Sequence, residues 1–361
     1  MRRSYIPGHL NIGALLGSRP KSQNNGDPVN LIKPLFVQAL TLLLLVVAEP
    51  LSAQANPPLM TGVAGPAINL VYALLTKDAG LWQKHGLDAR VVVFESGSIL
   101  AQAALSGEVK FSISSGPATI ASRAQGADTI ILAAMVNTLP YSIVAAKNIT
   151  RWDQLKGKKI AISRFGSGTD TAVRMVLRKY GLDPVKDVSI LQVGTQPARI
   201  QALAAGVIDA TIVSPPLDFQ AKKQGYQILV NIADLKIPYP QLVIETTERY
   251  AKENPQTVKS FLKGFIEGVH YAANHKDETK KIMTKYLKTV DPEILDVTYQ
   301  NFLETTDYSG RPNLDGIRNA MDEVAARVPA LKSRKPEDFV DTRILRELEK
   351  EGFFKQFQKK L

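Results

Sequence analysis

Short loops of small polar residues recur along the chain, and their residue types suit the binding of a small ligand. Each loop follows a predicted strand and precedes a predicted helix. The loops span residues 65–67, 95–98, 114–117, 166–170, 194–196 and 214–216. Ligands of open α/β sheets bind outside the carboxyl ends of the strands, and a helix N-terminus presents unpaired N–H groups with partial positive charge. The loops therefore predict a site for a phosphate, sulfonate, nitrate or carboxylate group.

The predicted ligand-binding residues lie in such a loop or where the chain is expected to cross between two halves. They are Pro66, Ser96, Gly97, Ser98, Ser115, Gly116, Tyr141, Arg164, Phe165, Ser167, Gly168, Thr169, Thr195 and Ser214. Other interpretations stay open for some of them. Ser98, Ser167 and Thr169 are equally suited to capping the helices that follow. Arg164 could face solvent, and Tyr141 could pack in a core or a hinge.

The loop at residues 163–169, Ser-Arg-Phe-Gly-Ser-Gly-Thr, has the most specific composition. Its two glycines allow the backbone to approach a ligand closely, Phe165 could cover or stack on the ligand, and Arg164 could pair with an anion. The Gly-x-Gly pattern lacks the third glycine of a dinucleotide fingerprint and the Gly-Lys of a P-loop. A nucleotide site is therefore not expected here.

No set of catalytic or metal-binding residues can be assembled from the spacing. The chain has no cysteine, which excludes a thiol nucleophile, a disulfide framework and Cys-ligated zinc. Beyond residue 55 the histidines are His85, His270 and His275, and the last two are too far apart around a helix to share a face. No Ser-His-Asp arrangement is evident. We therefore expect a protein that is not an enzyme and that needs no metal or cofactor.

The loops belong to two segments that resemble each other at an offset of 99 residues. Residues 104–117 align with residues 203–216, which places Gly107 on Gly206 and Ser115 on Ser214. Each copy reads as a helix end, a glycine turn, a strand and a Ser-x-Pro loop. Two related α/β units in one chain predict two lobes that face each other across a cleft.

Strands that alternate with helices predict a mostly parallel sheet flanked by helices in each lobe. The predicted division is residues 56–143 for the first part of lobe 1, residues 144–239 for lobe 2, and residues 240–361 for the return to lobe 1 plus C-terminal helices. In this last part an apolar stripe runs from Val258 to Val269 at helical spacing. We expect the C-terminal helices to pack on lobe 1 and brace both lobes, without chemistry of their own.

Residues 1–55 are predicted to be a leader with a signal peptide at about residues 33–55. An apolar run at residues 35–48 follows Lys33 and leads to Ala53-Gln54-Ala55, which together are the parts of a cleaved secretory signal. The run is shorter than the roughly 20 residues of a membrane span, and an uncleaved anchor is the alternative. Because the polar segment before the run is unusually long for a signal, we interpret Met1 as a start codon assigned too far upstream.

The chain carries a formal net charge of +11, of which residues 1–55 supply five basic and two acidic side chains. Much of the remaining excess lies in the C-terminal third, at Lys276, Lys280, Lys281, Lys285 and Lys288. Aromatic residues do not alternate with these lysines, so we interpret them as a solvated helical face and expect no nucleic-acid partner. The charge favours an anionic ligand only weakly.

Several segments resemble periplasmic substrate-binding proteins of the nitrate, sulfonate and taurine class. They are residues 73–94, Gly97-Ser98 with residues 104–108, residues 152–161 and residues 253–262. The resemblance implies a two-lobe, type II periplasmic binding fold that closes on its ligand, with contacts at residues 96–98, 115–117, 165–169 and Ser214. It also implies a periplasmic protein that serves the permease and ATPase of an ABC importer. We expect a monomer.

The loop after the first strand departs from this class, because residues 65–68 carry no polar side chain. This departure disfavours nitrate or a simple sulfonate and leaves room for a larger, partly apolar ligand, so we expect a small anionic or aromatic organic solute. Two alternatives stay open: a ligand-sensing protein that serves a receptor, and a pyrimidine-precursor enzyme of the same fold. The enzyme requires a Cys-rich segment, which this chain lacks.

Overall fold

The computed structural model describes residues 58–65, 67–288 and 290–357, so the predicted leader and signal peptide lie outside the described residues. The first of two sheets has the strand order β2-β1-β3-β10-β4. Its parallel strands are β1 (Leu59–Val63), β2 (Ala89–Val93), β3 (Phe111–Ser114) and β4 (Thr129–Val136), and β10 (Leu242–Thr247) runs antiparallel between β3 and β4. Every residue of β4 is buried, as expected of an apolar strand covered on both faces.

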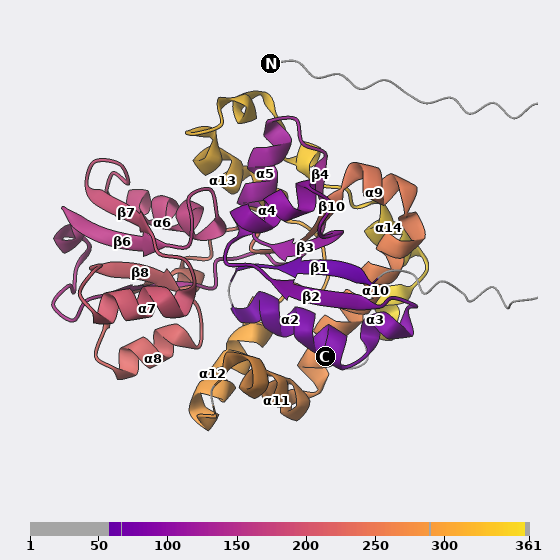
Figure 1. Ribbon diagram of the computed structural model, residues 1–361, viewed down its shortest axis with the longest axis horizontal. Coiled ribbons are helices and arrows are strands. Elements are labelled where there is room, and N and C mark those ends of the chain that lie inside the picture. The colour runs from indigo at the N-terminus through magenta and orange to yellow at the C-terminus, as the bar shows by residue number, and fades with distance from the viewer. Residues whose placement is uncertain (1–57, 66, 289, 358–361) are drawn as a thin grey trace, which may run out of the picture. The chain divides into compact units, whose positions relative to one another are not determined.

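The second sheet repeats this arrangement with the order β7-β6-β8-β5-β9. Its parallel strands are β6 (Lys158–Ile162), β7 (Val188–Gln192), β8 (Ala210–Val213) and β9 (Gln227–Asn231). The antiparallel strand, β5 (Ser142–Ala145), lies between β8 and β9. In Figure 1 this sheet lies to the left and the first sheet to the right of it.

The predicted internal repeat is confirmed by the positions of the elements. Strands β1, β2 and β3 begin and end 99 residues before β6, β7 and β8. The helices α4 (Gly97–Leu105) and α7 (Gln196–Ala204) are related by the same offset. The two halves therefore place equivalent residues at equivalent points of two sheets of the same topology, which allows a comparison residue by residue.

Helices cover both sheets, as the alternation of apolar segments predicts. The first sheet is flanked by α2 (Ala67–Asp78), α3 (Leu81–Lys84), α4 and α5 (Pro117–Ala124), and the second by α6 (Gly168–Lys179), α7 and α8 (Leu217–Lys223). The remaining helices are α9 (Glu248–Glu253), α10 (Pro255–Asn274), α11 (Lys276–Leu287), α12 (Pro292–Thr305), α13 (Leu314–Ala325) and α14 (Arg343–Lys350). Short 3-10 turns are η1 (Trp152–Leu155), η2 (Ile232–Leu235), η3 (Pro329–Ser333), η4 (Pro336–Phe339) and η5 (Phe353–Gln356).

The largest apolar core joins the first sheet to α10. The predicted stripe of this helix is buried along its whole length, from Val258 to Val269. Phe261 stacks on Phe111 of β3, with ring centroids 3.8 Å apart, and on Trp82 of α3, at 5.0 Å. Burial of such aromatic side chains is among the larger contributions to folding. The packing of α10 therefore stabilises the first sheet on the face that this helix covers.

The chain crosses between the sheets twice, and the two crossings are hydrogen-bonded to each other. The backbone N–H of Tyr239 donates to the carbonyl of Asn137 at 2.9 Å, and that of Gln241 donates to the carbonyl of Val136 at 3.0 Å. Tyr239 and Tyr141, which flank the crossings, are both buried. The paired crossings form a narrow two-stranded connection between the two sheets.

Helix α13 braces the two halves, as expected of part of the C-terminal region. It contacts both α5 and α6, and its buried face, including Ile317 and Met321, packs into an apolar cluster that contains residues of both sheets. Ion pairs join Glu323 of α13 to Arg178, and Arg327 to the buried Asp170 of α6. Helix α13 therefore joins the two halves both by apolar packing and by ion pairs.

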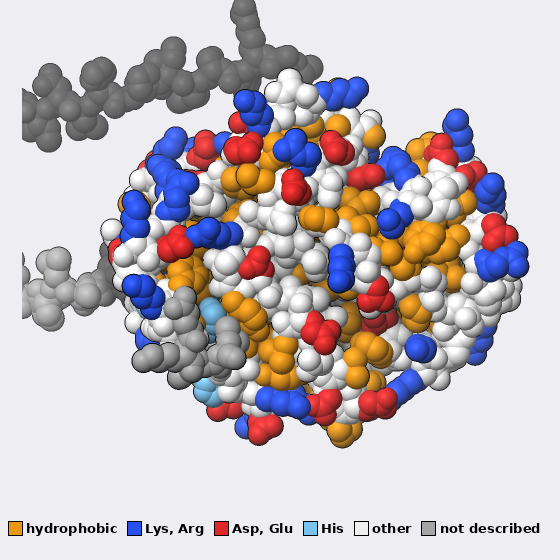
Figure 2. Space-filling view, turned by 180° about the vertical axis from the view of Figure 1, so that it is seen from behind, with side chains coloured by type: hydrophobic (Ala, Val, Ile, Leu, Met, Phe, Trp, Pro, Cys, Tyr) orange, Lys and Arg blue, Asp and Glu red, His pale blue; other side chains and the backbone are white. Residues whose placement is uncertain are grey.

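The lysines of the C-terminal helices lie at the surface, and several of them form ion pairs. Lys276 and Lys280 form ion pairs with Asp296, and Lys285 pairs with Asp78. Figure 2 shows acidic side chains among the basic ones over the visible face. In the described part of the chain, no helix has the length and hydropathy needed to span a membrane.

Candidate functional site

A cavity of about 380 Å³ lies between the two sheets, at the carboxyl ends of their parallel strands. Residues 63–65, 93–97 and Ser115 line it from the loops after β1, β2 and β3. Ser163 and residues 167–169 line it from the loop after β6, and residues of the loops after β7 and β8 line it as well. The six loops that the sequence singled out therefore meet at one place.

Most of the predicted site residues line this cavity. They are Ser96, Gly97, Ser115, Tyr141, Ser167, Gly168, Thr169, Thr195 and Ser214. Because these residues come from both halves of the chain, a molecule in the cavity would contact both sheets at once. Whether they contact a ligand stays a prediction.

Four other predicted residues do not line the cavity, and each has a physical reason. The hydroxyl of Ser98 lies 3.1 Å from that of Ser96, Gly116 packs closely against Pro240, and Phe165 is 48% exposed. Arg164 forms an ion pair with Glu95 of the first half, with Nε and Oε1 3.4 Å apart. Pro66 lies outside the described residues.

Three hydroxyls of the 163–169 loop bond to one another at the cavity wall. The oxygens of Ser163, Ser167 and Thr169 are 2.8 to 2.9 Å apart, and the N–H of Asp170 donates to Ser167 at 3.4 Å. Ser167 thus caps α6 and lines the cavity. The backbone N–H of Gly166 donates to Asp170 at 2.9 Å, which holds the loop to its own helix.

Side chains of the first half add a second polar cluster. Gln241 donates to the hydroxyl of Ser115 at 2.6 Å, beside Tyr141, and all three side chains are buried. Burial raises the pKa of Tyr141 to about 12, against the opposing effects of Arg199 and of hydrogen bonds with Gln241 and Ser115. The phenol therefore keeps its proton at neutral pH and can donate a hydrogen bond into the cavity.

Arg199, in the first turn of α7, is a lining residue that the sequence interpretation missed. Its side chain is only 1% exposed. Nε donates to the hydroxyl of Thr211 at 3.2 Å, Nη2 to the carbonyl of Ile212 at 2.8 Å, and Nη1 to the carbonyl of Gly194. The available signal was its position one helical turn before the buried Leu203, on the same face of the predicted helix.

The C-terminal helices also reach the cavity, although none of the predicted site residues lies in them. Tyr286, Leu287 and Lys288, at the end of α11, line it. Nearby, Lys223 of α8 forms ion pairs with Asp291 and Glu293 at the start of α12, at 3.1 and 2.7 Å. The corner between α11 and α12 thus contacts the second half of the molecule.

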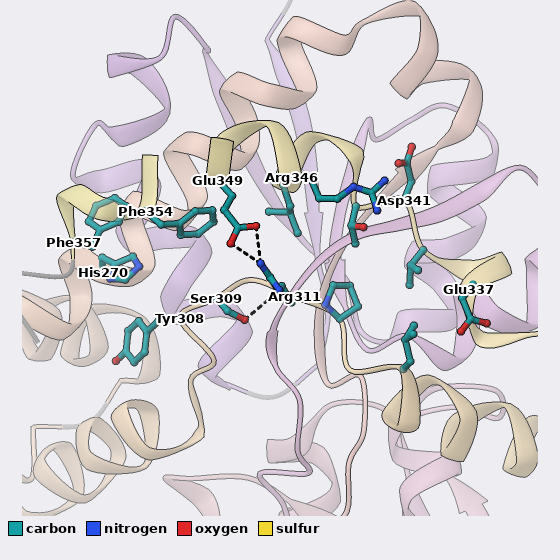
Figure 3. Close-up of a pocket in the computed structure, with 15 residues that line it drawn as sticks. His270, Tyr308, Ser309, Arg311, Glu337, Asp341, Arg346, Glu349, Phe354 and Phe357 are labelled. Carbon is teal, nitrogen blue, oxygen red and sulfur yellow. Dashed lines mark hydrogen bonds and ion pairs between the residues drawn. The ribbon is translucent and has the colours of Figure 1, made fainter. Parts of the chain in front are cut away.

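A larger cavity of about 820 Å³ lies elsewhere, between residues 308–314 and the C-terminal segment (Figure 3). Arg311 pairs with both carboxylate oxygens of Glu349 at 2.6 Å, and His270 stacks on Phe357. Burial lowers the pKa of His270 to about 4, so it is neutral at pH 7. This surface does not combine loops from the two sheets, and its central charges satisfy each other, so the cavity between the sheets is the candidate site.

The described residues contain no group of three or more acidic or histidine side chains that could hold a metal ion. In the cavity between the sheets, the lining groups are hydroxyls, amides, the buried guanidinium of Arg199, the carboxylate of Glu95, the exposed ammonium of Lys288 and apolar side chains. Such a set can bind a small molecule by hydrogen bonds and burial. It offers no evident base beside a nucleophile.

Sequence comparison finds relatives that are binding proteins. A provisionally named binding protein of Brucella abortus is 29% identical over 252 residues, covering 68% of this chain and 76% of the relative. A provisionally named aliphatic sulfonates-binding protein of Bacillus subtilis is 28% identical, covering 70% of this chain and 76% of the relative. The taurine-binding periplasmic protein of Escherichia coli is 28% identical over half of this chain and 57% of its own length.

Solved structures share the fold. A protein of Bordetella bronchiseptica RB50 superposes with a TM-score of 0.73 at 23% identity, covering 82% of this chain and 98% of that one. The alkanesulfonate-binding protein SsuA of Xanthomonas axonopodis pv. citri, solved with MOPS bound, gives a TM-score of 0.64 at 19% identity, covering 77% and 95%. The predicted two-lobe periplasmic binding fold is confirmed.

The model of one family, described as NMT1/THI5 like, matches residues 68–279. The match runs from α2 to α11 and so includes most of the loops that line the cavity between the sheets. The predicted resemblance to substrate-binding proteins is confirmed by the named relatives. The chain belongs to the NMT1/THI5-like family.

Proposed function

We propose that this protein is the extracytoplasmic solute-binding component of an ABC importer. It captures a small anionic or aromatic organic solute in the cavity between its two sheets. The observation that carries the proposal is the convergence of equivalent loops from two sheets on one cavity. A ligand held there contacts both halves, so binding favours the arrangement in which the halves are close together.

The two sheets with their helices act as lobes in this proposal. Lobe 2 corresponds to residues 144–239, and lobe 1 to residues 56–143 together with residues 240–361. The hydrogen-bonded crossings at Asn137 and Tyr239 provide a connection of few residues about which a hinge closure can occur. The importer would then recognise the closed form, and the protein would act as a monomer.

The cavity is large enough for an organic solute. Its volume of about 380 Å³ is roughly thirteen times the ~30 Å³ that a water molecule occupies in the liquid. Apolar side chains, including Leu70, Phe94 and Leu217, line it beside the hydroxyls. Alkanesulfonates are therefore sensible first ligands to test, since relatives of this chain bind sulfonates by name, and nitrate alone would leave most of the cavity to water.

Export and transport partners belong to the same proposal. The leader at residues 1–55 would be cleaved on secretion, which would place the binding protein in the periplasm beside its permease and ATPase. Fractionation of cells that express the full chain, followed by mass spectrometry of the mature N-terminus, tests this step. An N-terminus that begins at residue 56 is the expected result, and a membrane-bound product with the leader retained contradicts it.

Calorimetric titration of the exported protein tests solute capture. The panel holds alkanesulfonates, nitrate, bicarbonate, phthalate-like acids, hydroxymethylpyrimidine and riboflavin. We expect at least one tight ligand, compaction by X-ray scattering at saturation, and no product by mass spectrometry. Formation of product would favour an enzyme instead. Binding without any uptake defect in a deletion strain would favour a receptor-linked sensor.

A further inference from the structure

We propose that Arg199 selects the charge of the solute, so that the cavity binds a molecule with one negative group on a mainly apolar body and rejects zwitterions. This inference rests on the proposed solute capture and narrows its ligand class. It is carried by the burial of the guanidinium, by its lack of an acidic partner, and by the chemistry of the other lining residues.

The guanidinium of Arg199 is buried without a counter-ion in the described part of the chain. Its three hydrogen bonds go to neutral acceptors, the hydroxyl of Thr211 and the carbonyls of Gly194 and Ile212. No carboxylate of the described residues forms an ion pair with it, and its pKa is shifted by burial and by Tyr141 alone. A guanidinium has five N–H donors, so three hydrogen bonds leave two donors for another molecule. Buried charges are normally paired, which makes a bound anion the missing partner.

The charge persists at physiological pH and lies at the cavity. Burial lowers the pKa of Arg199 to about 10, which still leaves the group protonated at pH 7. The side chain lines the cavity together with Gln196 and Pro197 of its own helix and with Ser214 of the next loop. Its positive charge also lowers the pKa of Tyr141 against the larger effect of burial, as expected of groups that face the same space.

The lining has no free carboxylate to receive a positive group. Glu95 is its one carboxylate among the described residues, and it is paired with Arg164 and partly exposed. Asp218 lies close by in α8 but does not line the cavity, and it accepts a hydrogen bond from the hydroxyl of Ser142 at 2.8 Å. An ammonium group would therefore lose its water without gaining a partner, at a cost that excludes zwitterions such as taurine.

A series of six-carbon probes that differ only in the charged group tests the inference. The probes are 1-hexanesulfonate, hexanoate, 1-hexanol and 6-aminohexanoate, titrated by calorimetry into the wild-type protein and into Arg199→Gln and Arg199→Lys. We expect the two anions to bind the wild type at least about 30-fold more tightly than the alcohol or the zwitterion. In Arg199→Gln this preference should vanish while the affinity for hexanol changes less than about threefold.

Two controls separate a loss of charge from a loss of folding. Melting temperatures of the three proteins show whether the loops anchored by Arg199 remain folded. Arg199→Lys keeps the positive charge, so its titration should show part of the preference for anions. Wild-type binding of hexanol or 6-aminohexanoate as tightly as the anions would overturn the inference, as would an unchanged preference in Arg199→Gln. A protein that closes on a neutral or zwitterionic solute would keep the proposed function and lose only this inference. A protein that binds no solute would fail both.

Discussion

Leu100 and Arg199 occupy the same position in the two halves of the molecule, 99 residues apart, and they differ completely in chemistry. Each is the fourth residue of its helix, α4 or α7, and both are almost fully buried. Leu100 packs in a small apolar cluster with Ala64 and fills the space above Gly62, where an added Cβ would lie 2.1 Å from the leucine. The fold therefore needs a buried side chain at this position, and a hydrocarbon suffices. On the proposal that Arg199 selects the solute, its charge serves ligand binding and not the fold.

The same comparison extends to the hydroxyls beneath these two residues. Thr211 of β8 faces Val144 of the antiparallel strand β5 and is bonded by Arg199. Its counterpart, Ser112 of β3, faces Glu245 of β10. In one half a cation from a helix bonds to the hydroxyl of Thr211. In the other half the hydroxyl of Ser112 has no hydrogen-bond partner among the described residues, and Glu245 accepts a hydrogen bond from the hydroxyl of Ser114 at 3.2 Å. Only the cation lines the cavity.

Truncation of Leu100 should have the largest effect on the free energy of unfolding. Leu100→Ala should lower the free energy of unfolding by about 3 kcal/mol, because it removes a fully buried side chain that the surrounding sheet cannot replace. Leu105→Ala, in the same helix, is the matched control, since Leu105 is 45% exposed and should cost less than about 1 kcal/mol. Urea unfolding measures both. Equal losses in the two variants would show that the helix propensity, and not the packing of Leu100, had been measured.

Glu245 should make the stability depend on pH. Burial raises the pKa of its carboxyl to about 8, with hydrogen bonds from Thr119 and Ser114 opposing the effect. In the unfolded chain the group ionises near pH 4.5. Between about pH 4.5 and pH 8 the folded state therefore holds one proton that the unfolded state has lost, and the free energy of unfolding falls as pH rises. From pH 6.5 to 8 the loss should be about 2 kcal/mol. The range from pH 6.5 to 8 lies above the range in which His270 affects stability. There the lowered pKa of His270 would make the free energy of unfolding rise with pH.

Glu245→Gln supplies the control for that pH dependence. The amide is neutral at every pH, so denaturant unfolding at pH 6.5 and 8 should give nearly the same stability for the variant and different values for the wild type. A wild-type stability that does not change over this range, or a variant with the same slope as the wild type, would show that Glu245 is not the titrating group.

The sequence predicted the positions of the two sheets well, because helices, strands and loops that recur at one offset leave few alternative topologies. It also predicted which loops meet, since the carboxyl ends of parallel strands share one edge. Arg199 was missed for a physical reason. A basic residue in a helix is usually solvated. Only the three acceptors around its guanidinium, one in the loop after β7 and two in strand β8, show why it is buried here.

The other differences between the predicted and the observed lining residues also arise from packing and backbone geometry. Tyr286 and Leu287 are more than 60 residues beyond the last predicted loop, and only the packing of α11 and α12 brings them to the cavity. Arg164 and Phe165 were predicted to contact the ligand because a guanidinium can pair with an anion and a phenyl ring can cover or stack on a ligand. The backbone turn at Gly166, with φ of 78°, instead leaves the ring of Phe165 half exposed, and Arg164 pairs with Glu95. Side-chain direction in a loop depends on such turns, which periodicity does not encode.

Replacing Arg199 by leucine, the residue at the equivalent position of the first half, tests the comparison directly. Arg199→Leu should reduce the affinity for 1-hexanesulfonate by at least about 30-fold, while the free energy of unfolding changes by no more than about 1 kcal/mol. The loss of three hydrogen bonds is offset by the removal of a buried, unpaired charge. Gln201→Leu, on the exposed face of the same helix, is the control and should change neither quantity. A large loss of stability with retained affinity would assign Arg199 to the fold.

The ion pair between Glu95 and Arg164 should have the smallest effect, although it joins the two halves across the cavity. Both side chains are more than one-third exposed, and their atoms are 3.4 Å apart, so water and salt screen the interaction. Arg164→Gln should therefore change the free energy of unfolding by less than about 0.5 kcal/mol and the affinity for 1-hexanesulfonate by less than about threefold. Arg151→Gln, which breaks an exposed pair with Asp153 inside the second half, is the matched control. If Arg164→Gln instead weakened binding as much as Arg199→Leu, the charge that selects the solute would lie at the rim of the cavity, and the contrast between Leu100 and Arg199 would lose its functional meaning.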